Sequence, residues 1–420
     1  EINRAKHAKK SFAAAWDSQF GSWEYQAVMN KEKGTEIIVD WEDKTSVRMS
    51  AAQLYDIIFD GNNKWMLSAN GTIFTYEYEA IIPGLLKRWY AERQEMQQKM
   101  RDCGDNEIER EYWDKRQLVK KINLNSLYGA ILNPGCRFFD IRIGQSVTLT
   151  GRCITKHMAS KVNEIVAGKY DHKGESVVYG DTDSVYFTAH KTLKKEIDDG
   201  VIPWTKESVV ALYDKISDEV NSSFKAFMTK AFHTPSTRGE VIAAGRELVA
   251  SKGLFITKKR YAVLYYDKEG TRTDTEGKEG KMKAMGLDLK RSDTPVFVQD
   301  FLSDLLYMVL TGKTEIEVLE KISEFRAEFK ARPGWEKGSP KRANNMTKYT
   351  EEEEKKGKTN MPGHVRASMN WNKCREMYGD KYSMPITDGA KVIVCKLKSN
   401  PLNYTSIAYP IDELRIPEWF

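Results

Sequence analysis

The stretch Val177–Phe187 reads VVYGDTDSVYF and places two aspartates between two short runs of β-branched and aromatic residues. This pattern is typical of two strands joined by a tight turn, because Gly and Asp tolerate the backbone angles of a hairpin tip. If the tip stays extended, side chains two residues apart point the same way, so Asp181 and Asp183 would lie together. Paired carboxylates repel each other unless a hard cation such as Mg²⁺ lies between them. The turn is therefore a candidate metal site, and an ordinary acidic hairpin turn is the alternative.

The composition is that of a globular protein: the chain has 420 residues, of which 40% are hydrophobic and 30% are charged. This length predicts two or three domains. We find no run of eighteen apolar residues and no signal-peptide pattern, so we expect no membrane association. The five cysteines lack C-x-x-C spacing and the six histidines lack metal-ligand spacing. Free thiols in a reducing compartment are therefore favoured over a zinc site or a disulfide framework.

The net charge of +6 is concentrated in one part of the chain. Residues 252–291 contain eleven Lys and Arg against six Asp and Glu, a net charge of +5. A basic segment of this kind indicates a polyanionic partner. A solvated surface loop is the alternative.

Periodicity and turn signals predict alternating helical and strand-rich regions. Helices are expected at residues 1–34 (in part), 50–59, 83–101, 109–132, 151–167, 206–232, 295–310 and 314–330. Strands are expected at 35–40, on both sides of Asn70-Gly71, at 137–149, within 240–267 and at 391–397. Residues 332–363 are polar and low in complexity, which predicts a mobile loop or an insertion.

A second candidate site lies on the helix expected at 109–132. At 100° per residue, Lys121, Asn125 and Tyr128 share one stripe, and Gly129 follows directly. An ammonium, an amide and an aromatic ring make a poor core face but would suit a nucleotide, and Arg93 could reach the same phosphates with its forked guanidinium. The alternative is a solvated helix face on which Tyr128 is half-packed.

These motifs together resemble family B DNA polymerases over roughly residues 50–410. Lys121-x-x-x-Asn125-Ser126-x-Tyr128-Gly129 resembles the family's nucleotide-binding finger helix, and Tyr179-Gly180-Asp181-Thr182-Asp183-Ser184 resembles its metal-binding palm hairpin. Arg93 after Ile81-Ile82-Pro83 resembles the first finger helix, and Lys258-Lys259-Arg260-Tyr261 the primer-gripping strand. Gly286-Leu287-Asp288 with Lys290-Arg291 resembles the palm-to-thumb junction, and details such as Arg137-Phe-Phe-Asp140 resemble the replicative polymerases of T-even-like tailed phages.

The resemblance implies an α+β right-hand polymerase fold. Its palm would be an antiparallel sheet, its fingers two helices and its thumb mostly helical. The implied domains are an N-terminal extension leading into the palm (1–80), fingers (81–134), palm (135–291) and a partial thumb (292–420).

The resemblance also implies template-directed DNA synthesis, in which a nucleotide is transferred from a dNTP to a primer 3′-hydroxyl with two Mg²⁺ ions. Asp183 would ligate the metals with Asp181 in support, and Glu240 is a further candidate ligand. The implied nucleotide-binding residues are Lys121, Asn125, Tyr128, Gly129 and Arg93. The implied primer-template contacts are Lys258, Lys259, Arg260, Tyr261, Lys290 and Arg291, which would grip the duplex through its phosphates.

The sequence departs from the family's pattern in one important place. The family has a further metal-binding Asp in a D-x-x-SLYPS segment upstream of the finger helices, and this sequence has none. Asp40 and Asp43 lie at roughly the right place, but their neighbours do not resemble the motif. The second basic position of the first finger helix is Gln97, and there is no room for the exonuclease and amino-terminal domains.

We therefore predict that the chain is the carboxy-terminal part of a split polymerase. Because it starts at Glu1 and ends at Phe420, earlier than a complete thumb and clamp-binding tail would, we expect a processed chain or part of a longer protein. A separate amino-terminal polypeptide would supply the missing Asp and the exonuclease, and a sliding clamp is a further candidate partner. The implied location is the cytoplasm of an infected bacterium. The alternatives are a catalytically inactive remnant that binds DNA or serves as a structural subunit, and a fragment of an ordinary polymerase.

Overall fold

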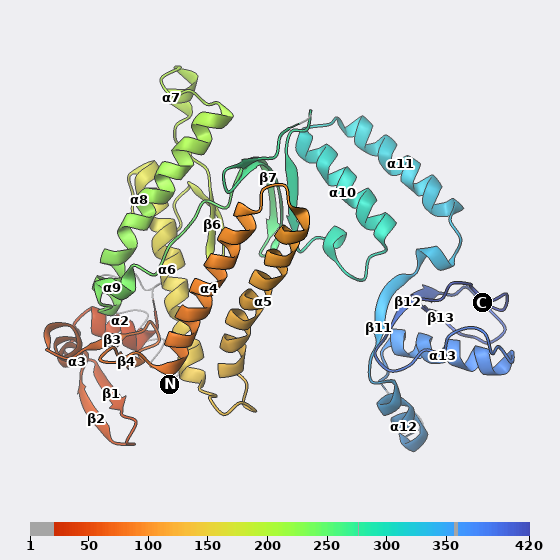
Figure 1. Ribbon diagram of the computed structural model, residues 1–420, viewed down its shortest axis with the longest axis horizontal. Coiled ribbons are helices and arrows are strands. Elements are labelled where there is room, and N and C mark those ends of the chain that lie inside the picture. Colours follow the sequence, from red (N-terminus) through yellow and green to blue (C-terminus); the bar gives the residue numbers. More distant parts are fainter. Residues whose placement is uncertain (1–20, 276, 357–359) are drawn as a thin grey trace. The chain divides into compact units, whose positions relative to one another are not determined.

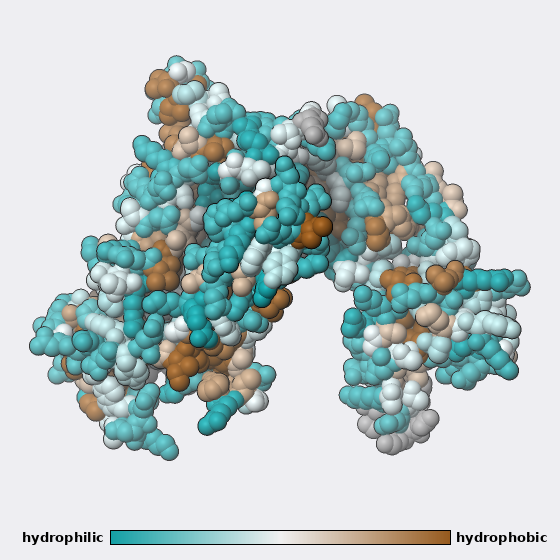
Figure 2. Space-filling view, viewed as in Figure 1, coloured by the Kyte–Doolittle hydropathy of each residue, from teal (hydrophilic) through white to brown (hydrophobic). Residues whose placement is uncertain are grey.

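The computed structural model describes residues 21–275, 277–356 and 360–420 (Figure 1). The helix expected within residues 1–34 lies largely outside these ranges. The chain divides into two compact units, one ending at Arg246 and the other beginning at Glu247. Both mix helices with small antiparallel sheets, which confirms an α+β protein. Hydrophilic residues predominate on the face shown in Figure 2, and no helix of the described residues is long and apolar enough to cross a membrane.

The first unit starts with a small mixed core. It contains α2 (Trp23–Met29), β1 (Glu36–Asp40), β2 (Ser46–Ser50), α3 (Ala51–Tyr55), a π-helical turn (Asp56–Asp60), β3 (Trp65–Leu67) and β4 (Ile73–Thr75). Ser50 and Gln53 form a capping box at the start of α3. Gly71 turns the β3–β4 hairpin with a φ of 85°. The hydroxyl of buried Tyr25 donates a 2.7 Å hydrogen bond to the carbonyl of Ala231, which ties this core to a later helix.

Two long helices follow, α4 (Ile81–Asp102) and α5 (Glu107–Ile131), close to the predicted bounds. They run antiparallel, because Arg93 hydrogen-bonds Gln117 while Lys99 lies over the ring of Trp113. Neither helix has a buried face apart from Ile131 at the end of α5. The pair is therefore held largely by polar and cation–π contacts between partly exposed side chains.

The next helix corrects a prediction. α6 runs from Ile141 to Ala167, so most of the segment 137–149 is helical rather than extended. The β-branched residues of this segment favour strands, but Asp140 caps the helix by accepting a hydrogen bond from the backbone NH of Arg142. Gly144 also lies against Leu132, where any larger side chain would collide with the leucine. Capping and tertiary packing thus outweigh local propensity.

The hairpin β5 (Val177–Asp181) and β6 (Ser184–Phe187) lies beside α6, and α8 (Lys206–Phe232) packs on α6 through a core of Val162, Ile216, Val220 and Phe224. Short helices α7 (Lys194–Asp198) and α9 (Ser236–Gly239) flank α8 in sequence. In the described residues the two strands of the hairpin pair only with each other. This differs from the expected palm sheet that carries the hairpin, because the larger sheet belongs to the second unit.

The second unit is built on a sheet of order β10-β8-β7, with β9 (Thr271–Arg272) also paired to β8. Its strands are β7 (Leu248–Thr257), β8 (Arg260–Lys268) and β10 (Lys281–Met285). β8 is central and almost continuously buried, as its YAVLYY run favours. A 3₁₀ turn (Asp288–Lys290), α10 (Val296–Thr311) and α11 (Glu315–Ala331) follow, and Thr314 and Glu317 form a capping box at the start of α11.

The last part of the chain corrects two further expectations. Residues 332–363 contain a 3₁₀ turn (Trp335–Lys337), β11 (Ser339–Ala343) and α12 (Met346–Lys356) rather than only a loop. β11 pairs with β12 (Ala390–Lys396), which pairs with β13 (Ser406–Pro410), and α13 (Gly363–Met377) places the fully buried Trp371 against this sheet. The expected mostly helical region therefore also contains a three-stranded sheet.

Candidate functional site

The acidic hairpin tip is a two-residue turn. Asp181 pairs with Ser184, and Thr182 and Asp183 form the loop between them. Thr182 has a φ of 50°, so a β-branched residue occupies the left-handed region that Gly or Asn usually takes. The condition that the tip stays extended is therefore not met: Asp181 ends a strand and is partly buried, whereas Asp183 lies in the exposed loop.

Three side-chain hydrogen bonds hold this turn. The hydroxyl of Thr182 donates to Oδ1 of Asp181 over 3.1 Å, and that of Ser184 donates to the carbonyl of Asp181 over 3.2 Å. From α6, the hydroxyl of Thr155 donates to the carbonyl of Thr182 over 2.8 Å. The strained residue at the tip is thus fixed from outside the hairpin, by a contact between residues 27 positions apart in the sequence.

The donor chemistry of the turn suits a hard cation, because Mg²⁺ prefers carboxylate oxygens. Within the described ranges, no group of three or more His, Cys, Asp or Glu side chains is arranged to hold a metal ion. Glu240, the further candidate ligand, forms an ion pair with Lys225 of α8. Of the three predicted ligands, Asp181 and Asp183 therefore share one turn, whereas Glu240 is engaged in an ion pair.

The predicted nucleotide stripe on α5 is solvent-accessible. Lys121, Asn125 and Gly129 are exposed, and a Cβ added at Gly129 would meet no atom within 4 Å. Tyr128 is partly buried, and its hydroxyl donates a 3.0 Å hydrogen bond to the carbonyl of Gly144 in α6. The stripe thus presents a cation, an amide and open backbone to solvent, beside a tyrosine ring whose hydroxyl is anchored.

Arg93 joins the same helix pair. Its Nε donates a 3.2 Å hydrogen bond to Oε1 of Gln117, one helical turn before Lys121. Lys120, which was not singled out from the sequence, pairs with Glu92 of α4. Lys121 makes no hydrogen bond or ion pair with any described residue. Of these two adjacent lysines, Lys120 therefore links α5 to α4, whereas Lys121 is available to a ligand.

α6 connects the two predicted sites of the first unit. It contacts α5 where Gly144 accepts the hydrogen bond from Tyr128, and it contacts the acidic turn through Thr155. From residue 144 to residue 155 the helix rises about 16 Å at 1.5 Å per residue. The predicted nucleotide stripe on α5 and the acidic turn are therefore both hydrogen-bonded to the same continuous helix, α6.

In the second unit, the predicted DNA-binding residues fall at the turn between β7 and β8. Lys258, Lys259 and Arg260 are exposed, and Lys259 has a φ of 61°. Gly286, with a φ of 64°, lies so close that an added Cβ would be 2.0 Å from the carbonyl oxygen of Lys259. Tyr261 does not fit the prediction of a DNA contact, because it is 7% exposed and stacks on Phe255. From Tyr261 onward β8 is almost continuously buried, so this ring belongs to the core, whereas Arg260 before it is exposed.

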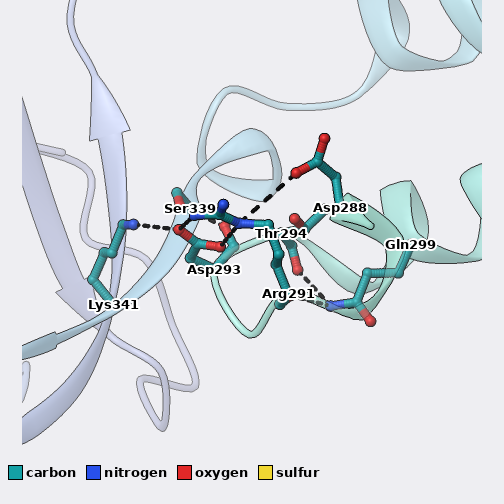
Figure 3. A network of polar contacts seen from close by, with 7 residues as sticks. All are labelled: Asp288, Arg291, Asp293, Thr294, Gln299, Ser339 and Lys341. Carbon is teal, nitrogen blue, oxygen red and sulfur yellow. Dashed lines mark hydrogen bonds and ion pairs between the residues drawn. The ribbon is translucent and has the colours of Figure 1, made fainter. Parts of the chain in front are cut away.

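The junction residues form a polar network (Figure 3). The guanidinium of Arg291 donates to both carboxylate oxygens of Asp293 over 2.9 and 3.0 Å, and Lys341 donates to Oδ2 of Asp293 over 2.7 Å. Arg291 and Lys341 together hold the pKa of Asp293 well below its usual range. Arg291 is thus engaged with Asp293, whereas Lys290 is exposed. Lys341 could not be found from the sequence, since it lies on β11, 48 residues away.

Comparisons with known proteins find similarity to DNA polymerases. Residues 37–231 match DNA polymerase family B. The chain is 32% identical over 307 residues to the DNA-directed DNA polymerase of Escherichia phage RB69, covering 70% of this chain and 33% of that protein. It is 29% identical over 309 residues to the DNA-directed DNA polymerase of Enterobacteria phage T4, again covering 70% and 33%. It is 28% identical over 237 residues to the DNA polymerase delta catalytic subunit of Oryza sativa, covering 56% and 18%. The chain thus spans about a third of the length of the two phage proteins.

Proposed function

We propose that this chain, which is similar to family B DNA polymerases, is the fingers, palm and thumb part of such an enzyme. Its reaction would be template-directed transfer of a nucleotide from a dNTP to the 3′-hydroxyl of a primer. The observation that carries the proposal is that the acidic turn and the cationic stripe of α5 are both anchored to α6. All three elements lie within the segment that matches the family.

The residues divide into three roles in this proposal. Asp183 and Asp181 hold Mg²⁺, and bound metal ions would stabilise charge on the attacking and leaving oxygens. Lys121 and Arg93 bind the triphosphate, because fixed cations neutralise phosphate charge without reorganising. Asn125 and Gly129 leave space for the nucleotide, and the ring of Tyr128 packs against the new base pair while its hydroxyl is held.

The exposed basic residues at the β7–β8 turn would bind the backbone of the primer-template duplex. Lys258, Lys259 and Arg260 lie together there, and Lys290 is a further candidate. Contacts to phosphates are independent of sequence, as a replicative enzyme requires. Tyr261 and Arg291 are better explained as positioning residues, since one lies in the core and the other pairs with Asp293.

We further propose that a second polypeptide completes the metal site. An octahedral ion such as Mg²⁺ needs more ligands than one hairpin supplies, and the family's upstream Asp motif is not present in these 420 residues. The chain spans about a third of the length of the two phage polymerases. A separate amino-terminal chain that carries this Asp and an exonuclease would account for part of the remaining length. A sliding clamp would be a partner of the assembled enzyme.

Purification of the tagged chain from its native source tests both proposals. Mass spectrometry would identify the chain that co-purifies, and primer extension would be measured with the isolated chain and with the complex. We expect the complex to extend the primer and the isolated chain to show no extension. Extension by the isolated chain would overturn the second-polypeptide proposal and leave the polymerase proposal standing. An inactive complex that still binds primer-template would overturn the polymerase proposal.

A further inference from the structure

A groove of about 310 Å³ lies between α10 and α11 in the second unit, and the proposed function does not use it. Its lining follows helical spacing on both sides, so each helix presents one stripe to the groove. The lining residues are Phe297, Asp300, Phe301 and Asp304 on α10, and Lys321, Glu324, Phe325, Glu328 and Arg332 on or directly after α11.

Four phenylalanines form an aromatic cluster at this groove. Phe301 and Phe325 stack face to face with ring centroids 3.7 Å apart. Phe297 lies 6.0 Å from both Phe325 and Phe329. None of the four rings is fully buried, and Phe329 is 36% exposed. The described residues therefore leave part of an aromatic surface accessible to solvent.

The groove already holds two of the chain's own cations. Lys321 pairs with Asp304 at 3.8 Å, and Arg332 pairs with Glu328 at 2.7 Å. The guanidinium of Arg332 also lies 4.3 Å from the ring centroid of Phe297. Arg332 is thus held in this groove by a carboxylate and a phenyl ring together, through charge and the cation–π interaction.

Two further carboxylates in the same groove have no such partner. Asp300 and Glu324 are exposed and make no hydrogen bond or ion pair with the described residues. With four acidic and two basic side chains, the lining has a net charge of −2. This charge repels the phosphates of nucleic acid and attracts a basic group.

We propose that the α10–α11 groove binds a basic amphipathic helix of a partner protein. An Arg or Lys of that helix would insert beside the phenyl rings and pair with Asp300 and Glu324, as Arg332 does with Phe297 and Glu328. Apolar side chains one turn away would cover the exposed edge of the cluster, as in other helix-in-groove complexes. A protein segment fits better than DNA because only a polypeptide combines positive charge with apolar anchors.

A defined peptide tests this proposal on the complete chain. The probe is an 18-residue fluorescein-labelled peptide of Leu, Ala, Gln and Arg, with Leu at helical i, i+3, i+4 and i+7 spacing and Arg along both sides. A scrambled peptide of the same composition tests whether the amphipathic pattern matters. The groove variant is Asp300→Lys with Glu324→Lys, and the matched control is Asp198→Lys with Asp412→Lys, which makes the same charge change at exposed sites outside α10 and α11.

We expect fluorescence anisotropy to show that the groove variant binds the peptide at least about tenfold more weakly, as lost and reversed ion pairs imply. The control variant should bind within about twofold of the parent protein. Circular dichroism checks that both variants fold. Equal binding by both variants, or equal binding of the scrambled peptide, would overturn the proposal. Displacement of the peptide by duplex DNA, or self-association of the chain in light scattering that the groove variant abolishes, would assign the groove to another occupant and also overturn it.

Discussion

The hydroxyl of Thr155 donates a 2.8 Å hydrogen bond to the carbonyl of Thr182, the residue whose φ of 50° shapes the acidic turn. A non-glycine residue in this conformation is costly and persists only where its surroundings determine it. Thr155 is therefore the side chain on α6 that fixes where Asp181 and Asp183 lie.

In the proposed polymerase, replacing Thr155 should alter the dependence of primer extension on Mg²⁺. Thr155→Val keeps the shape and removes the donor, a loss of about 1 kcal/mol, so we expect the assembled polymerase to need more Mg²⁺ for half-maximal extension. Thr155→Ser keeps the hydroxyl and should restore the parental Mg²⁺ titration. A purely structural role would instead lower the thermal stability without moving the Mg²⁺ midpoint.

Removing Asp183 should separate catalysis from DNA binding. Asp183→Ala deletes the exposed carboxylate of the turn, and metal ions contribute several kcal/mol to such reactions, so primer extension should fall by at least about 10³-fold. Primer-template affinity, measured by anisotropy, should change little. Asp198→Ala on α7 is the exposed control and should leave both quantities unchanged. A parallel loss of DNA binding in Asp183→Ala would favour a scaffold without catalytic function.

The adjacent lysines of α5 should respond differently to substitution. Lys121 is exposed and without a described partner, so Lys121→Ala should raise the KM for dNTP about tenfold through loss of a charge-assisted phosphate contact. Lys120 pairs with Glu92, so Lys120→Ala should lower the stability of the helix pair by up to about 1 kcal/mol with little change in KM. Steady-state kinetics and urea denaturation measure the two effects. Equal KM values for the two variants would contradict the assignment.

Gly286 should be intolerant of a side chain. Gly286→Ala combines a left-handed backbone with a collision at the carbonyl of Lys259, and we expect a loss of roughly 2–4 kcal/mol. Gly270→Ala is the matched control, because Gly270 also has a positive φ, 84°, but has open space at its Cβ position. It should cost only about 1 kcal/mol, as measured by denaturation with urea. Equal losses of stability in the two variants would show that the close approach of Gly286 to Lys259 does not affect the free energy of unfolding.

His157 should make the fold sensitive to acid. Burial, with nearby Lys161, lowers the pKa of His157 to about 4 from its ordinary value near 6.5. Its ring nitrogens lie 2.7 Å from the hydroxyl of Tyr170 and 2.9 Å from that of Ser223. As the pH falls, the unfolded state takes up this proton near pH 6.5 and the folded state only near pH 4. The contribution of His157 to the free energy of unfolding is therefore complete above pH 6.5. It is lost as the pH falls toward 4, by at most about 3 kcal/mol.

Urea denaturation between pH 7 and pH 4 measures this effect. His157→Gln should remove this part of the pH dependence, whereas His190→Gln at an exposed position should retain it. An unchanged slope in the His157 variant would contradict the prediction.

Local signals predicted much of the fold. α8 has the expected bounds, because helical periodicity is encoded within a few residues. The misses depend on distant contacts. The start of α6 is set by Gly144 against Leu132, and β11 owes its conformation to pairing with β12, some fifty residues later.

The same distinction applies to the candidate sites. The acidic turn, the exposed stripe of α5 and the basic β7–β8 turn could be predicted from short motifs. The support from Thr155 and the capture of Arg291 by Asp293 and Lys341 could not, because they arise where separate elements meet. The burial of Tyr261 follows from the central position of β8 in its sheet, which a four-residue motif does not encode.

α6 is one uninterrupted helix of 27 residues. A continuous helix resists bending, so a rotation of α6 at Gly144 would also rotate the helix at Thr155. Tyr128 and Thr182 are hydrogen-bonded to two points of this rigid helix. A movement of α5 would therefore be accompanied by a small displacement of Asp181 and Asp183.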